Sequence, residues 1–333
     1  MKALFSLIVV LVLAGIAYAG AGLAHLQFIF GVVIPYLALV LFLGGFIYRI
    51  VKWAKTPVPF RIPTTCGQEE SLPWIKQNKI DNPSTQLGVF LRMVLEVLCF
   101  RSLFRNTKTE LREDENGPKL GYGSSQWLWL FAICFHWSFL IIILRHLRLF
   151  LEPIPAFVTV LDQVDSVLEI GLPALYITDV LFIGALLYLF LRRVVIPQIR
   201  YISLAADYFP LFMLLGIGTT GMLMRYAYRI DLVAIKEVAM GLVTFNPVIP
   251  SGIGSLFYVH LFLVSSLFAY FPLSKLMHMG GIFMSPTRNM INNNRRVRHV
   301  NPWNYPVEVH TYEAYENDFR DKMIKAGIPV EKE

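Results

Sequence analysis

The chain has 333 residues, of which 56% are apolar and only 16% are charged, and its mean hydropathy is +0.55. Soluble globular domains carry about 25% charged residues, so a soluble enzyme is excluded. The net charge of +7 is compatible with nucleic-acid binding, but in so apolar a chain basic residues more often mark the cytoplasmic face of a membrane protein. We therefore expect a membrane protein with no nucleic-acid partner.

Cysteine usage limits the metal chemistry of the chain. Cys66, Cys99 and Cys134 are the only cysteines, and none forms a CxxC pair. An iron-sulfur cluster usually takes four thiolates, and a structural zinc takes four ligands around one point. Any metal in this protein must therefore use other ligands.

Six apolar runs are long enough to cross a bilayer as helices. They cover residues 3–24, 28–48, 127–149, 174–191, 208–228 and 255–276. The first run has a signal-peptide alternative, with an AxA-like cleavage site at 17–19, but its uncharged stretch is too long for a usual signal peptide and favours an uncleaved helix. The sequence predicts an all-α membrane protein, a bundle of six transmembrane helices.

Basic residues are distributed unevenly between the two sides of this bundle. Of the 30 Lys and Arg residues, 25 lie on one side, and the other side has five, namely Arg145, Arg148, Arg225, Arg229 and Lys236. By the positive-inside rule, 51–126, 192–204 and the tail 281–333 are cytoplasmic, and 150–173 and 229–254 are external. We expect a multi-pass protein of the cytoplasmic (inner) membrane with a cytoplasmic C-terminus.

The cytoplasmic loop 51–126 contains an amphipathic segment at 84–105. Its four charged residues are spaced 4, 5 and 4 apart and share one helical face: Arg92, Glu96, Arg101 and Arg105. We predict an interfacial helix along the inner membrane surface. It either anchors the loop or forms a docking platform for a cytoplasmic subunit.

The tail 281–333 combines basic residues with an acidic, Tyr-rich stretch that lacks sustained apolar periodicity. Such a segment has little core of its own, so we expect it to become ordered against a partner. The alternative is that Arg295, Arg296 and Arg298 only bind anionic lipid headgroups.

Four of the seven histidines fall in two of the predicted helices. His136 and His146 lie in the third helix, and His260 and His278 in the sixth. Ionisable groups at membrane depth are costly and therefore indicate function, although a neutral histidine can simply form a hydrogen bond between helices. The two helices run antiparallel, so His146 and His260 lie toward the outside and His136 and His278 toward the inside.

The helical spacing within each pair is unequal. Ten residues of helix span about 15 Å and eighteen about 27 Å, so tilt, a kink at Pro272 and the width of a macrocycle must absorb the difference. Haem suits two imidazole pairs in a bundle, because its iron accepts an imidazole on both faces. Zinc would need four converging ligands. Iron held from both faces has no open position, which predicts electron transfer.

The segments HWSFLIIILRH (136–146) and HLFLVSSLFAYFPLSKLMH (260–278) resemble the gamma, cytochrome b, subunit of respiratory nitrate reductases. The resemblance implies a five-helix core in helices two to six and two b haems, an outer one held by His146 and His260 and an inner one held by His136 and His278. The domain prediction is then 1–50 for the first two helices, 51–126 for the loop, 127–280 for the four-helix di-haem core and 281–333 for the tail.

The extra first helix, the long cytoplasmic loop and the NPWNYP motif of the tail depart from nitrate reductase and resemble DsrM, the membrane cytochrome b of the DsrMKJOP complex. This implies electron exchange between menaquinol and a cytoplasmic DsrK-like iron-sulfur subunit, similar to heterodisulfide reductase, beside the J, O and P subunits in dissimilatory sulfur metabolism. A nitrate reductase gamma subunit and a haem-free anchor or transporter are the alternatives.

Three further groups remain open at this point. Arg145 and Arg148, with Arg225 and Arg229, either bind haem propionates or extend to lipid headgroups. Asp162, Asp165 and Glu169 either accept quinol protons or form a solvated helical face. No lysine lies between Lys119 and Lys236, so the lysine of the nitrate reductase quinol site has no counterpart here, and Arg145 or Arg148 can at most replace its charge.

Overall fold

The computed structural model describes residues 1–56, 68–115, 117–166, 173–297 and 310–331. Within them, five helices are long and apolar enough to cross a membrane: Lys2–Leu23, Ile29–Ala54, Gln126–Phe150, Ala205–Ala227 and Ser255–Leu273. They contain α1 (Lys2–Ala17), α2 (Ile34–Ala54), α5 (Gln126–Phe150), α9 (Ala205–Met222) and α11 (Ser255–Tyr270). The prediction of a helical, multi-pass membrane protein is confirmed for these five spans.

The remaining predicted span, 174–191, corresponds to α7 (Ile177–Val195), which is helical but is not among these five helices. Asp179, Arg192 and Arg193 lie near the ends of this helix. Its apolar stretch is therefore shorter than those of the other five helices.

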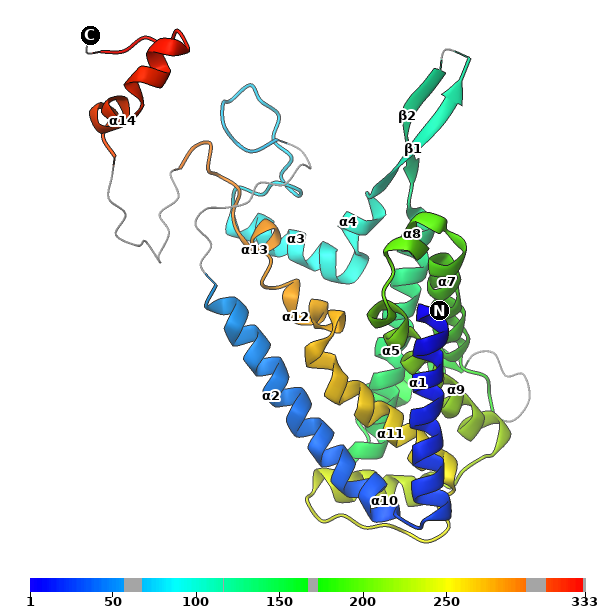
Figure 1. Cartoon of the computed structure of the whole chain (residues 1–333). Coiled ribbons are helices and arrows are strands. Elements are labelled where there is room, and N and C mark those ends of the chain that lie inside the picture. The colour runs from blue at the N-terminus through cyan, green and yellow to red at the C-terminus, as the bar shows by residue number, and fades with distance from the viewer. Residues whose placement is uncertain (57–67, 116, 167–172, 298–309, 332–333) are drawn as a thin grey trace.

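The helices form one bundle in which α1 packs against α9 and α11, α2 packs against α11, and α5 packs against α7 (Figure 1). Helix α9 also packs closely against α7, and a glycine of α9 allows this approach. A Cβ on Gly218 would lie 2.8 Å from side-chain atoms of Ile183 and Phe182 of α7. The GxGxxG pattern at 216–221 thus lies inside a membrane helix, where small residues permit helix packing.

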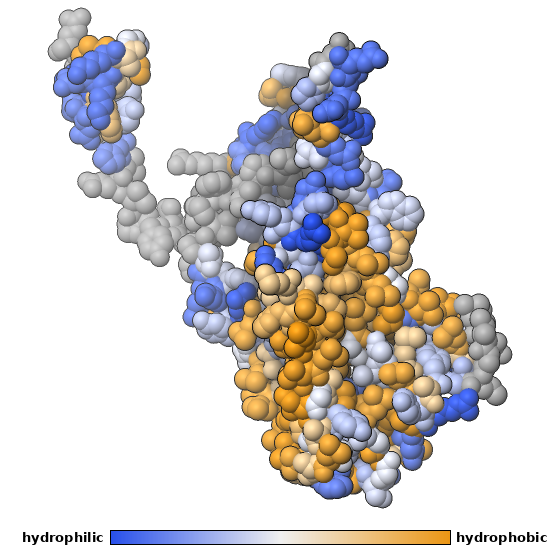
Figure 2. All heavy atoms as spheres, turned by 45° about the vertical axis from the view of Figure 1, so that its right-hand side comes forward, coloured by the Kyte–Doolittle hydropathy of each residue, from blue (hydrophilic) through white to orange (hydrophobic). Residues whose placement is uncertain are grey.

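The two ends of the bundle differ in what they carry (Figure 1). One end has the N-terminus of α1, α3 (Gln86–Cys99), α4 (Arg101–Phe104) and α8 (Pro197–Ile202), and the opposite end has α10 (Leu232–Val243). Figure 2 shows hydrophobic surface over the bundle and hydrophilic surface over the segments beyond its first end. This is the distribution expected of a bundle surrounded by lipid.

A β-hairpin in the loop was not predicted. Strands β1 (Thr107–Asp114) and β2 (Gly117–Ser124) pair antiparallel, with Leu111 opposite Leu120. The all-α prediction is wrong for this segment. The dipeptide Asn116–Gly117 in the sequence is a strong hairpin signal, and Gly117, the first residue of β2, has a positive φ of +98°, which favours glycine.

The tail also has more secondary structure than predicted. Helix α13 (Pro286–Asn289) lies beside α3, and α14 (Tyr312–Lys325) forms a separate helix that begins at the Thr311 side-chain cap (Figure 1). Apolar periodicity is weak in α14, which is why the sequence did not reveal it. The predicted positions Cys66, Glu169, Arg298 and 301–306 lie outside the described residues.

Candidate functional site

The histidines predicted for the inner site are brought together by α5 and the segment after α11. The imidazole centroids of His136 and His278 are 6.0 Å apart, and the two rings are nearly perpendicular, at 80°. A metal–imidazole bond is about 2 Å long, so two imidazoles on opposite sides of one metal have centroids roughly 6 Å apart. This pair therefore has the separation that axial ligation requires.

The sequence suggested that His278 lies in the sixth predicted membrane helix, but in the structure it lies beyond the end of that helix. Helix α11 ends at Tyr270 and is followed by two 3₁₀ turns, Phe271–Leu273 and Lys275–Met277, before α12 (His278–Gly281) begins. Ser274 between the turns is extended, with φ −109° and ψ 176°. The eighteen residues from His260 to His278 are thus not one straight helix, and the 27 Å rise expected for them does not apply.

The break is built from Pro272 and a glycine of α2. Proline cannot donate the helical hydrogen bond and clashes with the preceding turn, which ends the α-helix here. A Cβ on Gly45 would lie 2.6 Å from Pro272 Cβ, so only glycine lets α2 approach the break this closely. The predicted kink at Pro272 is confirmed and is larger than expected, since it separates two helices.

Each of the four histidines uses its Nδ1 atom in a hydrogen bond. The Nδ1 atoms of His136, His146 and His278 lie 2.7, 2.7 and 2.8 Å from the carbonyl oxygens of Ala132, Ile142 and Lys275. His260 Nδ1 lies 2.9 Å from Thr220 Oγ1. That hydroxyl also contacts the carbonyls of Gly216 and Ile217, so it donates to a carbonyl and accepts from the imidazole.

This arrangement fixes the tautomer of all four rings. A ring that donates from Nδ1 keeps Nε2 unprotonated when neutral, which leaves Nε2 as the ligating atom. Metal-bound histidines nearly always have such a hydrogen bond on their other nitrogen. The donor chemistry is thus the same at both predicted sites.

At the outer pair, His146 lies on α5 and His260 on α11. Helix α9 presents a glycine to this pair, because a Cβ on Gly221 would lie 3.4 Å from His260 Cε1. The imidazoles of His146 and His278 are exposed, and those of His136 and His260 are half-buried. Each predicted pair therefore combines one exposed ring with one that is packed within the bundle.

The residues present fit a haem held by two imidazoles better than a metal held by protein alone. Within the described part of the chain, no group of three or more His, Cys, Asp or Glu side chains is placed to hold a metal ion. A macrocycle supplies the remaining ligands, so two Nε2 atoms on opposite faces suffice. The separation of His136 and His278 matches this arrangement.

Arg145 lies next to His146 in the sequence but is already paired with carboxylates. Its side chain is buried, and its guanidinium nitrogens lie 3.2 Å from Asp165 Oδ2 and 2.8 Å from Asp179 Oδ1. Arg148 forms an ion pair with Asp162. The propionate role of Arg145 and Arg148 stays a prediction, and in the structure both guanidinium groups pair with the protein itself.

A tyrosine completes this network. The Tyr176 ring lies between two guanidinium groups, with Cζ of Arg145 at 3.7 Å and Cζ of Arg225 at 3.8 Å from its centroid. Its hydroxyl donates to Asp162 Oδ1 over 2.6 Å. Sequence analysis did not identify Tyr176, because nothing in its local pattern distinguishes it from a packing residue.

The acidic residues of α6 (Ala156–Asp165) do not form a solvated face. Asp165 is buried and accepts hydrogen bonds from Thr178 N and Thr178 Oγ1, at 2.9 and 2.6 Å. Buried carboxylates need such partners, and Arg145 also supplies the compensating charge. Asp162 and Asp165 therefore belong to a connected network beside the outer pair.

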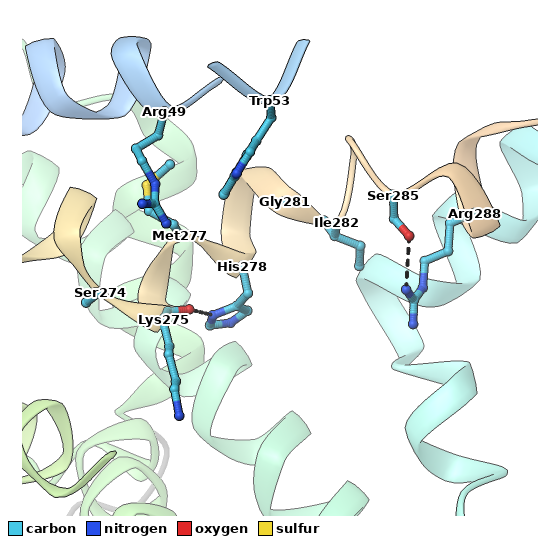
Figure 3. A pocket seen from close by; sticks show the side chains of 10 residues that line it. All are labelled: Arg49, Trp53, Ser274, Lys275, Met277, His278, Gly281, Ile282, Ser285 and Arg288. Carbon is cyan, nitrogen blue, oxygen red and sulfur yellow. Dashed lines mark hydrogen bonds between the residues drawn. The ribbon is translucent and has the colours of Figure 1, made fainter. Parts of the chain in front are cut away.

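A cavity of approximately 550 Å³ opens beside His278, at the end of the bundle that carries α3 (Figure 3). Arg49, Lys275 and Arg288 supply positive charge to its lining, and Trp53 supplies an aromatic side. Figure 3 shows Arg49 and Trp53 extending from α2 toward the segment that carries His278. Arg49 was missed because a basic residue at the end of a membrane helix is also the ordinary sign of a cytoplasmic boundary.

Comparison with known proteins connects this arrangement to one family. Residues 93–299, which include all four histidines, match the model described as nitrate reductase gamma subunit. A protein of Archaeoglobus fulgidus, called Hdr-like menaquinol oxidoreductase cytochrome b-like subunit, is 45% identical over 288 residues, 84% of this chain and 85% of its own length. A protein of the same description from Archaeoglobus profundus is 43% identical over 277 residues, 81% of each chain. The chain belongs to the nitrate reductase gamma subunit family.

Proposed function

We propose that the protein is a di-haem cytochrome b subunit that passes electrons between menaquinol and a cytoplasmic heterodisulfide-reductase-like iron-sulfur subunit. The family match and the descriptions of the two Archaeoglobus relatives support this proposal. The finer form of the proposal places a DsrK-like subunit on the cytoplasmic side, with J, O and P subunits beside it, in dissimilatory sulfur metabolism.

The proposal rests on the hydrogen bonds of the four imidazoles and on the separation of one pair of them. All four direct Nδ1 to an oxygen of the protein, and the pair His136 and His278 has the separation of two axial ligands. His136 and His278 would hold an inner haem, and His146 and His260 an outer one. A haem held in this way supplies one-electron transfer with no open position for substrate.

The protein's own contribution is to hold these ligands still. Two of the Nδ1 partners are carbonyls of the preceding turn of α5, so His136 and His146 are oriented by their own helix. His278 is oriented by the 3₁₀ turn at Lys275, and His260 by Thr220 of α9. Fixed ligands favour electron transfer, because little has to reorganise when the charge of the site changes.

The proposed topology has six spans, namely the five long apolar helices and α7. Helix α7 packs between α5 and α9, so it lies within the bundle although its ends are charged. With six spans the N-terminus, the hairpin and the tail are all cytoplasmic, in agreement with the distribution of basic residues. The inner pair then faces the partner, and the outer pair faces the opposite side of the membrane.

We place menaquinol exchange near the outer pair. Quinol oxidation releases protons, and the outer end has titratable groups: the hydrogen-bonded pairs Tyr176–Asp162 and Tyr226–Asp179, and Asp165, which Arg145 links to Asp179. A quinol site at the outer end also explains why two haems are needed, because electrons must cross most of the bilayer to reach the cytoplasmic partner.

The test is purification of the native complex in mild detergent, with a reduced-minus-oxidised optical spectrum and haem quantification per chain. We expect two low-spin b haems per chain, reduction by a menaquinol analogue and an iron-sulfur partner that co-purifies. Absence of haem would contradict the proposal in favour of a membrane anchor or transporter. A molybdenum-containing partner would replace it with a nitrate reductase gamma subunit.

A further inference from the structure

The short connection between α3 and α4 reaches a ligand of the inner site. Phe100 lies between these helices, and its ring is 4.8 Å from the His136 imidazole, centroid to centroid, in an edge-to-face arrangement of 82°. We use the term elbow for residues Leu98–Arg101. The elbow belongs to the loop 51–126, yet it touches a residue that lies ten positions inside a membrane helix.

The backbone of the elbow is held in an unusual conformation. Phe100 has φ +50° and ψ +44°, in the left-handed region that a bulky residue rarely adopts. Glu96 stabilises the turn, since its carboxylate accepts hydrogen bonds from the N–H of Ser102, at 3.1 Å, and from the Ser102 hydroxyl. The surrounding contacts therefore maintain a strained residue, which places its ring against His136.

Two tryptophans of α5 fix the depth of the elbow. Trp137 Nε1 donates to the Leu98 carbonyl over 3.1 Å, and Trp129 Nε1 donates to the Cys99 carbonyl over 2.8 Å. Trp137 lies eleven residues after the start of α5, about 16 Å along the helix axis, and its side chain leans back toward the N-terminus. The last turn of α3 thus lies alongside the interior of α5, well beyond the N-terminal end of that membrane helix.

The hydrogen bonds themselves point to an environment without water. The last carbonyls of a helix have no partner within the helix and normally bind water. In lipid each such group needs a donor from the protein. The two indole donors meet this requirement for Leu98 and Cys99, which a water-exposed helix end would not need.

Helix α3 has its charged and apolar sides reversed relative to a helix in water. Arg92 and Glu96 are buried, at 5% and 6% exposed, whereas Leu87 and Phe90 are 67% and 63% exposed. Leu91 and Leu98 extend the same exposed face. A helix that turns its charges to the protein and its apolar side chains outward is suited to contact with acyl chains.

We propose that the elbow is inserted into the lipid of the leaflet on the α3 side, where it forms the wall between the inner ligand pair and the acyl chains. Phe100 is the positioning residue for His136, since its ring packs edge to face against the imidazole, as the ring of Phe135 does, and each ring centroid is 4.8 Å from that of His136. The insertion is independent of the proposed function, and the effect on the inner haem rests on it.

The insertion can be tested with the natural cysteine of the elbow. Cys99 is exposed, so in a chain with Cys66→Ser and Cys134→Ser a nitroxide label reports its surroundings. The full-length chain in phospholipid vesicles is probed with oxygen, which concentrates in lipid, and with a water-soluble nickel chelate. Control labels go to Leu111→Cys of the hairpin and Ile143→Cys of α5, both exposed in the structure, with Cys99→Ser added.

We expect the Cys99 label to match the Ile143→Cys label, with high oxygen accessibility and at least a tenfold lower nickel accessibility than the Leu111→Cys label. Nickel accessibility equal to that of the hairpin label would overturn the insertion.

The positioning role is tested by redox titration of both haems in Phe100→Ala, Phe100→Tyr and Phe104→Ala. Phe104 is the matched control, because it lies on α4 and packs on Trp129 rather than on a ligand. Removing the Phe100 ring releases the His136 imidazole from this contact, so its orientation and the midpoint potential of the inner haem should change. We expect the reduced fraction of the inner haem at a fixed potential to change about tenfold in Phe100→Ala, equivalent to about 59 mV for one electron.

The outer haem should be unchanged in all three variants, and Phe100→Tyr should restore the inner midpoint. If Phe100→Ala and Phe104→Ala have the same inner midpoint as the unmodified protein, Phe100 does not position His136. Absence of haem from every variant, the unmodified protein included, would instead contradict the proposed function, and the label experiment would still decide the insertion.

Discussion

At the end of the bundle near the hairpin, His136 is packed among rings, whereas at the opposite end His146 neighbours a network of buried charges. The His136 imidazole has three aromatic neighbours within 6.0 Å, centroid to centroid: Phe100, Phe135 and His278. None of these three contacts involves a carboxylate. His136 is thus held by packing against aromatic rings.

The outer end is built from ion pairs and hydrogen bonds. Arg145 links Asp165 to Asp179, and the Tyr226 hydroxyl donates to Asp179 Oδ2 over 2.9 Å. Buried charges are retained only where partners compensate them, and each carboxylate of this network has at least two. Under the proposed function, the inner end would transfer electrons, while the outer end would also exchange protons.

The largest expected effect is the loss of haem when one predicted histidine ligand is removed, and the haem that is lost should depend on the end of the bundle. His136→Ala should lose the inner haem and His146→Ala the outer one, so each variant should retain about half of the haem, measured by pyridine haemochrome assay. His310→Ala, in an exposed part of the tail, is the control and should retain both. If His136→Ala still shows two low-spin haems in its EPR spectrum, the ligand assignment is wrong.

The charge network predicts a large loss of stability at the outer end. Arg145→Met leaves Asp165 and Asp179 buried without their cation, which should lower the free energy of unfolding by about 3–5 kcal/mol. The measurement is detergent-based denaturation followed by haem absorbance. Arg112→Met breaks the exposed Arg112–Glu110 pair of the hairpin, which solvent screens, so it should change the free energy of unfolding far less than Arg145→Met does. Equal midpoints for the two variants would refute the distinction between the ends.

The tail should matter for the partner and not for the haems. Asn292 donates from its backbone N–H to the Pro83 carbonyl over 2.8 Å, and Arg296 pairs with Glu70, so residues up to Val297 are anchored to the loop. A chain truncated after Val297 retains this anchor and lacks α14. We expect unchanged haem content and loss of the cytoplasmic subunit during affinity purification.

Retention of the partner in stoichiometric amount would show that α14 is dispensable for docking. A second truncation, after Ser285, also removes the anchor. It should release the partner as well, and comparison of the two separates the role of α14 from that of the anchored segment.

The smallest expected effect concerns Asp81, which joins the loop to α4. Burial raises the pKa of Asp81, but hydrogen bonds and charges from Arg101 and Arg105 outweigh burial and hold the pKa below its ordinary value of 3.8. A lowered folded-state pKa stabilises the protein above 3.8, and this contribution is lost as the pH falls through the lowered pKa. Both arginines are partly exposed, so Asp81→Asn should cost only about 1 kcal/mol at neutral pH.

The measurement is the difference in unfolding free energy between Asp81→Asn and the unmodified protein as a function of pH. The difference should shrink toward zero below pH 3.8. A difference that stays constant into acid would mean that the pair contributes nothing through its charge.

Sequence alone was sufficient for the features that depend on local composition. Apolar length located five membrane helices, and the antiparallel arrangement of two of the predicted helices brought His136 and His278 to the same end, where the structure has their rings 6.0 Å apart. The Asn116–Gly117 turn signal was also in the sequence and was missed. These features are readable because hydropathy, turn chemistry and spacing belong to short stretches of chain.

Only the tertiary structure decided how the segments meet. Pro272 predicted a kink, but the extended Ser274 that separates α11 from α12 depends on the fit of Pro272 against Gly45 of α2. The burial of Arg145 and the contact of Phe100 with His136 join residues 20 to 36 positions apart. Such contacts follow from the shapes of packed surfaces and from which polar groups remain to be satisfied after folding, and no local pattern encodes either.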